Sequence, residues 1–278
     1  MTPLKGAAVV GGGAVLAASG GYGLSRLLDD SMPSYVVLSE GAPITEGENT
    51  VGKAYGNYLI APYGKKGNIN PADASNKDKE DNEKWWTWSY KRWLYDLENK
   101  NKDNALSTEF QDKLKVGSAF SLTAVEDGKP KPLNQVCEGV YKKTKTDVSN
   151  NSDENKKKLW NNLWKYCSFF ATKITTVEKN GDSYGNGVYG TTKKAGLISV
   201  KDSNNDVFWN KRNEEFYSDK GDKKGKDASN GKFKDAYNNR DSNRRHIKEI
   251  CEVAYDKSSS TDATNYPEGD VIKFCSIT

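Results

Sequence analysis

Two matching patterns of apolar and polar positions stand out along the chain. In residues 133–141 the apolar residues and one cysteine recur every three or four positions, and residues 247–255 repeat this arrangement. Such spacing forms one apolar stripe along a helix, with the cysteine in the middle of each stripe. A second echo follows each stretch, because Lys-Tyr-Cys-Ser at 165–168 matches Lys-Phe-Cys-Ser at 273–276.

Further matches occur in the same order along the chain. We pair Trp88 with Trp209, and the Phe-x-Asp stretch 110–112 with 233–235. Chance could supply one such match, but several collinear matches indicate an internal duplication. The sequence therefore predicts two tandem related units.

The remaining periodicity is mostly helical. Residues 80–97 place aromatic and leucine side chains on one helical face, after an acidic first turn. We expect a short helix over 106–114, a helix from Leu133 and another over 153–170, whereas 51–63 suits a strand or an extended lead-in. The predicted fold is mainly α, with about four helices in each unit.

These patterns divide the chain into five parts. A stretch over 172–204 is rich in glycine and β-branched residues, and its Asn180-Gly181 dipeptide is typical of a hairpin, so we expect a short β-like linker there. The expected parts are a signal or membrane anchor (1–28), a spacer (29–78), helical unit 1 (79–171), the Gly-rich linker (172–204) and helical unit 2 (205–278).

The N-terminal part has the length of a membrane span. Residues 6–25 carry no charge and are flanked by Lys5 and Arg26, and about 20 apolar residues cross a bilayer core. Many of them are glycine, and residues 16–19 also suit signal-peptide cleavage. A membrane anchor, a cleaved signal and a flexible glycine-rich tail remain the alternatives.

Composition narrows the function classes. Basic and acidic residues nearly balance, at 42 and 38, and without Lys5 and Arg26 the body carries 40 basic against 38 acidic residues. Nucleic-acid binders concentrate positive charge on one face, so a nucleic-acid partner is not expected. Only 35% of residues are hydrophobic, and 7 Trp, 15 Tyr and 8 Phe must supply much of the core.

Four cysteines fall in two equivalent pairs. The duplication favours one bridge inside each unit, Cys137 with Cys167 and Cys251 with Cys275, among the three possible connectivities. Four reduced, buried cysteines in a cytosolic protein are the alternative. Neither the close cysteine pairs nor the nearby histidines of a metal site are present. We expect no metal and no cofactor. Disulfides and an export signal would support each other.

A tryptophan cluster is the strongest candidate for ligand binding. Trp85, Trp86, Trp88 and Trp93 lie within nine residues of one expected helix. They could form an aromatic platform for a ligand such as a carbohydrate, but aromatic core packing is the favoured interpretation.

Catalytic candidates are weaker. Ser183 follows Gly-Asp in the linker, and His246 is the single histidine, but nothing in the sequence pairs them as a nucleophile and base. A hydrolase using Asp or Glu pairs is a third alternative, although no pair stands out by its spacing. We predict a protein without catalytic residues, and a helix-start role for His246.

Three features together resemble paralogous families of uncharacterised membrane and surface proteins in haemotropic mycoplasmas. They are the opening 1–5 before a Gly/Ala-rich run, the Trp-Trp-x-Trp-x-Tyr-Lys-Arg stretch at 85–92, and the repeated Cys-Glu-x-x-Tyr and Lys-Tyr/Phe-Cys-Ser signatures. The resemblance covers nearly the whole chain and implies a wall-less bacterial parasite whose exported proteins face the host. We therefore expect a membrane-anchored or secreted surface protein, antigenic or binding a host protein or glycan.

Overall fold

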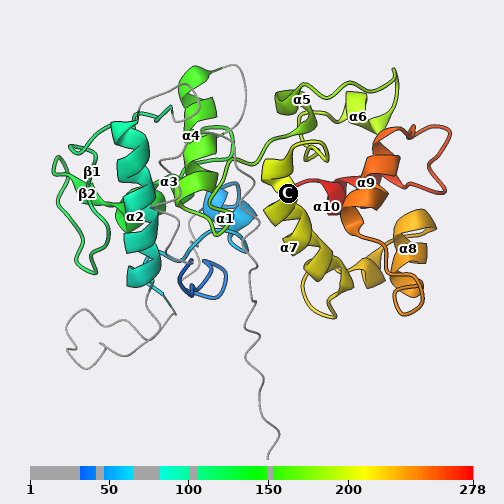
Figure 1. Cartoon of the computed structure of the whole chain (residues 1–278), viewed down its shortest axis with the longest axis horizontal. Coiled ribbons are helices and arrows are strands. Elements are labelled where there is room, and N and C mark those ends of the chain that lie inside the picture. Colours follow the sequence, from blue (N-terminus) through cyan, green and yellow to red (C-terminus); the bar gives the residue numbers. More distant parts are fainter. Residues whose placement is uncertain (1–31, 42–46, 65–81, 100–104, 149–152, 278) are drawn as a thin grey trace, which may run out of the picture.

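The protein is mainly helical, with little sheet. The computed structural model describes residues 32–41, 47–64, 82–99, 105–148 and 153–277. In Figure 1 the helices form two groups, with α1 to α4 on one side and α5 to α10 on the other. The expectation of a mainly α fold is confirmed.

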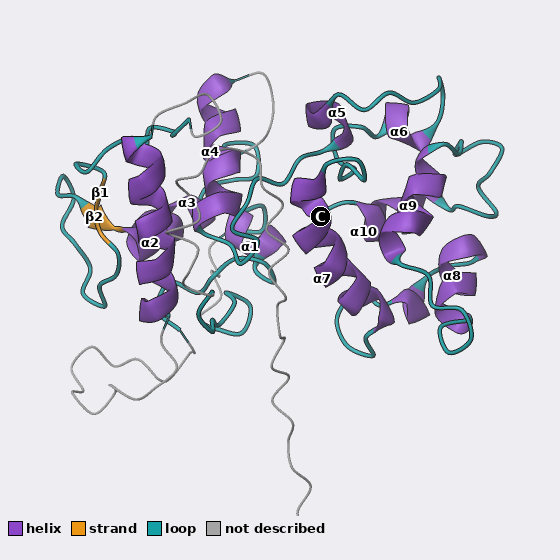
Figure 2. Cartoon of the chain, in the orientation of Figure 1, coloured by secondary structure: helices purple, strands orange, loops and turns teal. Residues whose placement is uncertain are grey.

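In its described residues, the first group combines four helices with one small pair of strands. Its elements are α1 (Val51–Tyr55), α2 (Glu83–Glu98), β1 (Val116–Ser118), β2 (Lys131–Pro132), α3 (Leu133–Tyr141) and α4 (Glu154–Tyr166). The strands β1 and β2 pair in parallel and form the small sheet coloured orange in Figure 2.

The second group consists of helices and turns. Its elements are α5 (Val177–Asn180), α6 (Tyr189–Thr192), the 3-10 helix η3 (Ser203–Asn205), α7 (Asp206–Tyr217), the 3-10 helix η4 (Gly225–Asp227), α8 (Gly231–Asn238), α9 (Ile247–Tyr255) and α10 (Glu268–Cys275).

The two predicted cysteine-bearing stripes are confirmed. They form α3 and α9, and the cysteine of each helix is fully buried. Pro132 is the N-cap of α3, where its missing N–H costs nothing, and His246 caps α9 by accepting from Lys248 N at 3.2 Å. The helix-start role predicted for His246 is confirmed, although its side chain is half-buried.

Both predicted disulfides are present. Cys137 bonds to Cys167 and Cys251 to Cys275, with Cα–Cα distances of 5.7 Å in each case. No cysteine of the chain is free. Each bridge joins the striped helix of one group to the last helix of the same group or the residue directly after it.

A backbone contact beside each disulfide recurs in both groups. Ile60 N donates to Cys167 O at 2.9 Å, and Ile198 N donates to Cys275 O at 2.9 Å. The residue that follows each of these cysteines forms an antiparallel bridge with the residue that precedes each isoleucine. An extended segment therefore lies against the end of the last helix in each group.

A buried tyrosine closes each of these contacts. The Tyr141 hydroxyl lies 2.9 Å from Ile60 O and 2.8 Å from Cys167 O. The Tyr255 hydroxyl lies 2.7 Å and 3.2 Å from the corresponding carbonyl oxygens in the second group. Burial raises the pKa of both tyrosines well above the usual value, so both stay neutral donors.

The tryptophan equivalence differs from the one predicted. Trp86 Nε1 donates to Ala61 O at 3.3 Å, and Trp209 Nε1 donates to Ser199 O at 3.1 Å. In this contact Trp209 resembles Trp86, whereas the sequence paired it with Trp88. Because α2 contains several closely spaced tryptophans, the sequence alone could not show which of them makes this contact.

Residues expected to form a spacer contribute to the core. Leu38, Leu59 and Ile60 are at most 1% exposed, and residues 51–55 form the helix α1 instead of the expected strand or extended segment. The described parts of the range 29–78 thus belong to the folded body.

The Gly-rich range 172–204 also differs from the expected β-like linker. It forms α5 and α6 and buries Ile174, Val177 and Ile198. Gly181 ends α5 with φ +71°, a left-handed conformation that favours glycine, and does not form a hairpin turn. Among the described residues, one β-bridge has both of its residues in this range, and it joins Thr176 to Ile198.

The helix expected over 106–114 is absent from that described segment, which forms turns instead. Phe110 packs in the core and its carbonyl accepts from Trp93 Nε1 at 2.8 Å, while Leu114 is 76% exposed. A single buried aromatic anchors the segment, so its apolar spacing does not require a helix.

In the part of the chain that the structure describes, no helix combines the length and apolar composition needed to cross a membrane. The expected anchor or signal at 6–25 lies outside the described residues.

Candidate functional site

The tryptophan cluster of α2 lies inside the protein. Trp85, Trp86 and Trp93 are 0% exposed and Trp88 is 7% exposed. The rings of Trp85 and Trp86 meet edge to face, with centroids 4.9 Å apart. A ligand platform needs accessible ring faces. The structure therefore places these side chains in packing contacts, and the platform interpretation does not fit their burial.

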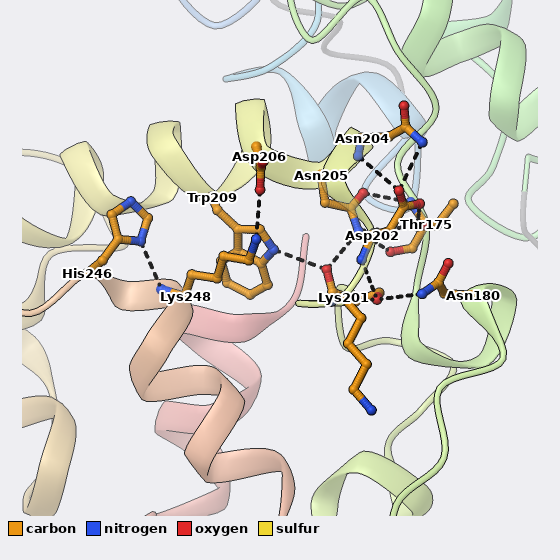
Figure 3. Close-up of polar contacts among 11 residues, drawn as sticks. Thr175, Asn180, Lys201, Asp202, Asn204, Asn205, Asp206, Trp209, His246 and Lys248 are labelled. Atoms are coloured by element: carbon orange, nitrogen blue, oxygen red, sulfur yellow. Dashed lines mark hydrogen bonds and ion pairs between the residues drawn. The ribbon is translucent and has the colours of Figure 1, made fainter. Parts of the chain in front are cut away.

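Ser183 and His246 show no contact in the structure. Ser183 is exposed after α5, whereas His246 begins α9 and uses Nδ1 to accept from Lys248 N. Burial lowers the pKa of His246, so its ring is neutral at physiological pH. Figure 3 shows His246 apart from the polar cluster beside α5. The geometry provides no nucleophile and base pair at these two residues.

That polar cluster joins side chains of the connection, of η3 and of the start of α7 (Figure 3). Asn205 accepts from Thr175 N at 3.0 Å and donates to Thr175 O at 2.9 Å and Ser199 O at 2.8 Å. Asp202 accepts from the Thr175 hydroxyl and from Asn204 N. The cluster fixes the extended segment at 175 against the start of α7.

Asn82 makes the same contacts in the first group. It accepts from Val36 N at 2.8 Å and donates to Val36 O at 2.9 Å and Ala61 O at 2.7 Å. A fully buried amide must satisfy its donors and its acceptor, and both Asn82 and Asn205 do so. Recurrence at both places indicates a structural role for this cluster.

The Ser199 hydroxyl contacts a carboxylate. It donates to Asp182 Oδ2 at 2.7 Å and accepts from Asn180 Nδ2 at 3.2 Å and two backbone N–H groups. The Asp182 carboxylate could accept the hydroxyl proton, but no histidine lies among these partners to complete a Ser-His-Asp arrangement. The hydroxyl thus serves to join α5 to the segment before η3.

A buried arginine connects the two groups of helices. Arg212 on α7 is 0% exposed, and its guanidinium donates to Glu215 Oε2 at 3.1 Å, to Tyr58 OH at 2.8 Å, and to Lys273 O and Phe274 O. Tyr58 belongs to the first group. Burial raises the pKa of Glu215, against the opposing effect of the guanidinium. The positive charge of Arg212 is therefore buried where the two helical groups meet.

A groove lined by residues of both helical groups is small and polar. It has a volume of about 230 Å³ and lies between residues 38–39, residues 52–54, residues 56–57 and Asp222. Ligand pockets are usually about 300–1,000 Å³ with apolar and aromatic walls. This groove offers Lys53 and Asp222 but no aromatic ring, and therefore does not resemble a small-molecule pocket.

A buried carboxylate forms a separate ionic cluster between α2 and α4. Asp96 is 3% exposed and accepts from Tyr166 OH at 2.5 Å and Lys165 Nζ at 2.6 Å. Arg92 lies close by, donates to Ala171 O and stacks over the Trp88 ring at 4.7 Å. The carboxylate is thus neutralised within the protein.

Metal ligands do not gather in the described residues. No group of three or more His, Cys, Asp or Glu side chains there is placed to hold a metal ion.

Sequence reasoning missed the Arg212 and Asn205 clusters because neither forms a local motif. The Asp-Ser-Asn-Asn run at 202–205, which suits a helix N-cap, was the one available signal.

Comparisons with protein-family models, with curated proteins and with solved structures give no match.

Proposed function

We propose that the protein is an exported surface protein that acts by binding or display, without catalysis. The observation that carries the proposal is the closure of all four cysteines into two buried disulfides, one in each helical group. Disulfides form and persist in oxidising compartments outside the cytosol. Their burial at 0% exposure gives them a structural role rather than that of an exposed redox pair.

The two helical groups are, in this proposal, tandem copies of one unit. Support comes from equivalent disulfides, equivalent tyrosine hydroxyl contacts and equivalent buried asparagines. On these contacts each copy includes short extended stretches ahead of its first long helix, at residues 36–37 and 59–61 in the first copy and at residues 175–176 and 197–199 in the second. The copies would thus begin earlier than the helical periodicity indicated.

The N-terminal residues 6–25 would hold this body at the membrane, or direct its secretion if they are cleaved. The partner would be a host protein or glycan, as the surface-protein resemblance implies. A near balance of 42 basic and 38 acidic residues suits a soluble exposed body. The alternative of a ligand module built on the tryptophans of α2 is less favoured because those rings are buried.

Protease treatment of intact cells tests the display. A trypsin-type protease should cleave the body while the membrane is sealed, at exposed lysines of the surface loops. An internal cytosolic protein must stay intact as the control for sealing. Full protection of the body until the membrane is opened would refute external display.

Peptide mapping without reductant tests the oxidised state. Protein taken from cells, with thiols blocked at lysis, should yield the linked peptides 137–167 and 251–275 and no blocked cysteine. Complete alkylation of all four cysteines would place the protein in a reducing compartment and remove the main support for export.

A further inference from the structure

Three lysines gather where the first helical group passes into the second. Lys157 lies on α4, Lys173 lies in the connection, and Lys179 lies on α5, and all three are half-buried. The positive charges of Lys157 and Lys173 both act on Lys179 and lower its pKa, so each of them lies within electrostatic range of Lys179. In Figure 1, α4 and α5 lie on either side of this connection.

The cluster is held by packed structure. Lys179 Nζ donates to Asn161 Oδ1 at 3.1 Å, and Asn161 lies one turn after Lys157, on the same face of α4. The buried Trp160 fixes the connection beside this face, since its Nε1 donates to Ile174 O at 3.3 Å. The three lysines are therefore brought together by the fold and not by a flexible loop.

Two neighbouring lysines form ion pairs with carboxylates, but in the part of the chain that the structure describes Lys157, Lys173 and Lys179 do not. Lys165, further along the same face of α4, pairs with Asp96 at 2.6 Å, and Glu178 pairs with Lys194 at 3.2 Å. Among the described residues, no carboxylate lies within ion-pair distance of Lys157, Lys173 or Lys179. Burial, together with the two positive neighbours, lowers the pKa of Lys179 to about 8.

We propose that Lys157, Lys173 and Lys179 form a binding site for a phosphate or sulfate group carried by a ligand. Each ammonium offers three N–H donors, and one donor of Lys179 is used by Asn161. A tetrahedral oxyanion accepts donors from several directions and supplies the negative charge that the cluster lacks. Binding would relieve the repulsion among the three ammonium groups.

The test uses the full-length, oxidised protein and titration calorimetry at constant ionic strength. The probes are inorganic phosphate and, separately, a sulfated disaccharide of the heparin type. We expect one saturable site, and a loss of about tenfold in affinity for Lys179→Gln, because one charge-assisted contact is removed. The probe that binds more tightly identifies the source of the oxyanion.

Lys158→Gln is the matched control. Lys158 is half-buried on the same helix and the substitution removes the same charge, but it lies on another face of α4 than Lys157. Affinity should change by less than about twofold in this variant. An equal loss in both variants, or no saturable binding of either probe, would overturn the proposal.

A second measurement needs no substitution. An amine-reactive reagent should label Lys179 of the native protein, and mass spectrometry should show that the bound probe protects Lys179 while Lys158 reacts as before. Unchanged labelling of Lys179 at a saturating probe concentration would also overturn the proposal. The result is independent of where the protein is displayed, so it separates this site from the proposed function.

Discussion

Replacing Arg212 with methionine removes the guanidinium from the junction of the two helical groups but keeps most of its apolar stem. The native guanidinium is fully buried and bonds to Glu215, to Tyr58 and to the carbonyls of Lys273 and Phe274. The methionine cannot donate to any of them. The carboxylate and two carbonyl groups then lose buried partners.

We expect Arg212→Met to lower the free energy of unfolding by about 3–5 kcal/mol. Loss of one partner from a buried ion pair has this cost because the other charge stays behind without compensation. The Glu215 side chain is 18% exposed, so water can reach part of the carboxylate and the lower end of the range is expected. The separate hydrogen bonds are not additive and should not be summed.

Chemical denaturation with guanidinium chloride at neutral pH, with both disulfides intact, measures this loss of stability. Arg240→Met is the control, since Arg240 stacks on Tyr237 at 4.3 Å in a half-buried position without a carboxylate partner in the described residues. It should cost less than about 1 kcal/mol. A loss for Arg212→Met no larger than that of the control would refute the account of the junction.

Three further predictions concern the body of the protein. Replacing both cysteines of either bridge with alanine should cost about 3–4 kcal/mol, and nearly the same for each, because their separations of 30 and 24 residues differ little; thermal and chemical denaturation of the two variants checks this. Asn82→Ala and Asn205→Ala should each lose about 2–4 kcal/mol in the same assay, since each strands buried backbone groups; a cost for one and not the other would contradict their equivalence. Because burial raises the pKa of Glu215 above 4.5, its contribution to stability is present below that value and is lost as pH rises through the raised pKa. The stability of the native protein relative to Glu215→Gln should therefore fall as the pH rises above about 4.5, and a difference that stays constant would contradict the shift.

The cysteine-bearing helices were predictable because their information is local. A stripe at spacings of three and four defines a buried face within nine residues, and α3 and α9 follow it. The disulfide pairing also followed from the sequence, since the repeated signatures assign one pair to each unit. No long-range contact had to be known for either prediction.

The extended segments could not be predicted in the same way. Ile60 and Ile198 are positioned by backbone bonds to residues far along the chain, Cys167 and Cys275. A short extended stretch has no helical period and looks like a spacer or linker when read alone. The described parts of 29–78 and 172–204 were therefore assigned too little structure.

The candidate sites depended even more on tertiary structure. Lys157, Lys173 and Lys179 form no motif, and only the packing of the connection against α4 brings them together. The tryptophans of α2 show the converse, because their density suggested a ligand platform and their burial assigns them to the core. Side-chain type alone does not reveal exposure.

The sequence by itself determined the helical stripes, the pairing of the four cysteines and the mainly α class, because each depends on residue type and short spacing. Only the tertiary structure decided which tryptophan of α2 makes a contact like that of Trp209, which segments join the core, and which of the described charges have no counter-charge nearby. Those properties depend on distances between residues that are far apart in the chain. The role of a polar or charged group depends on which other groups lie beside it in the folded protein.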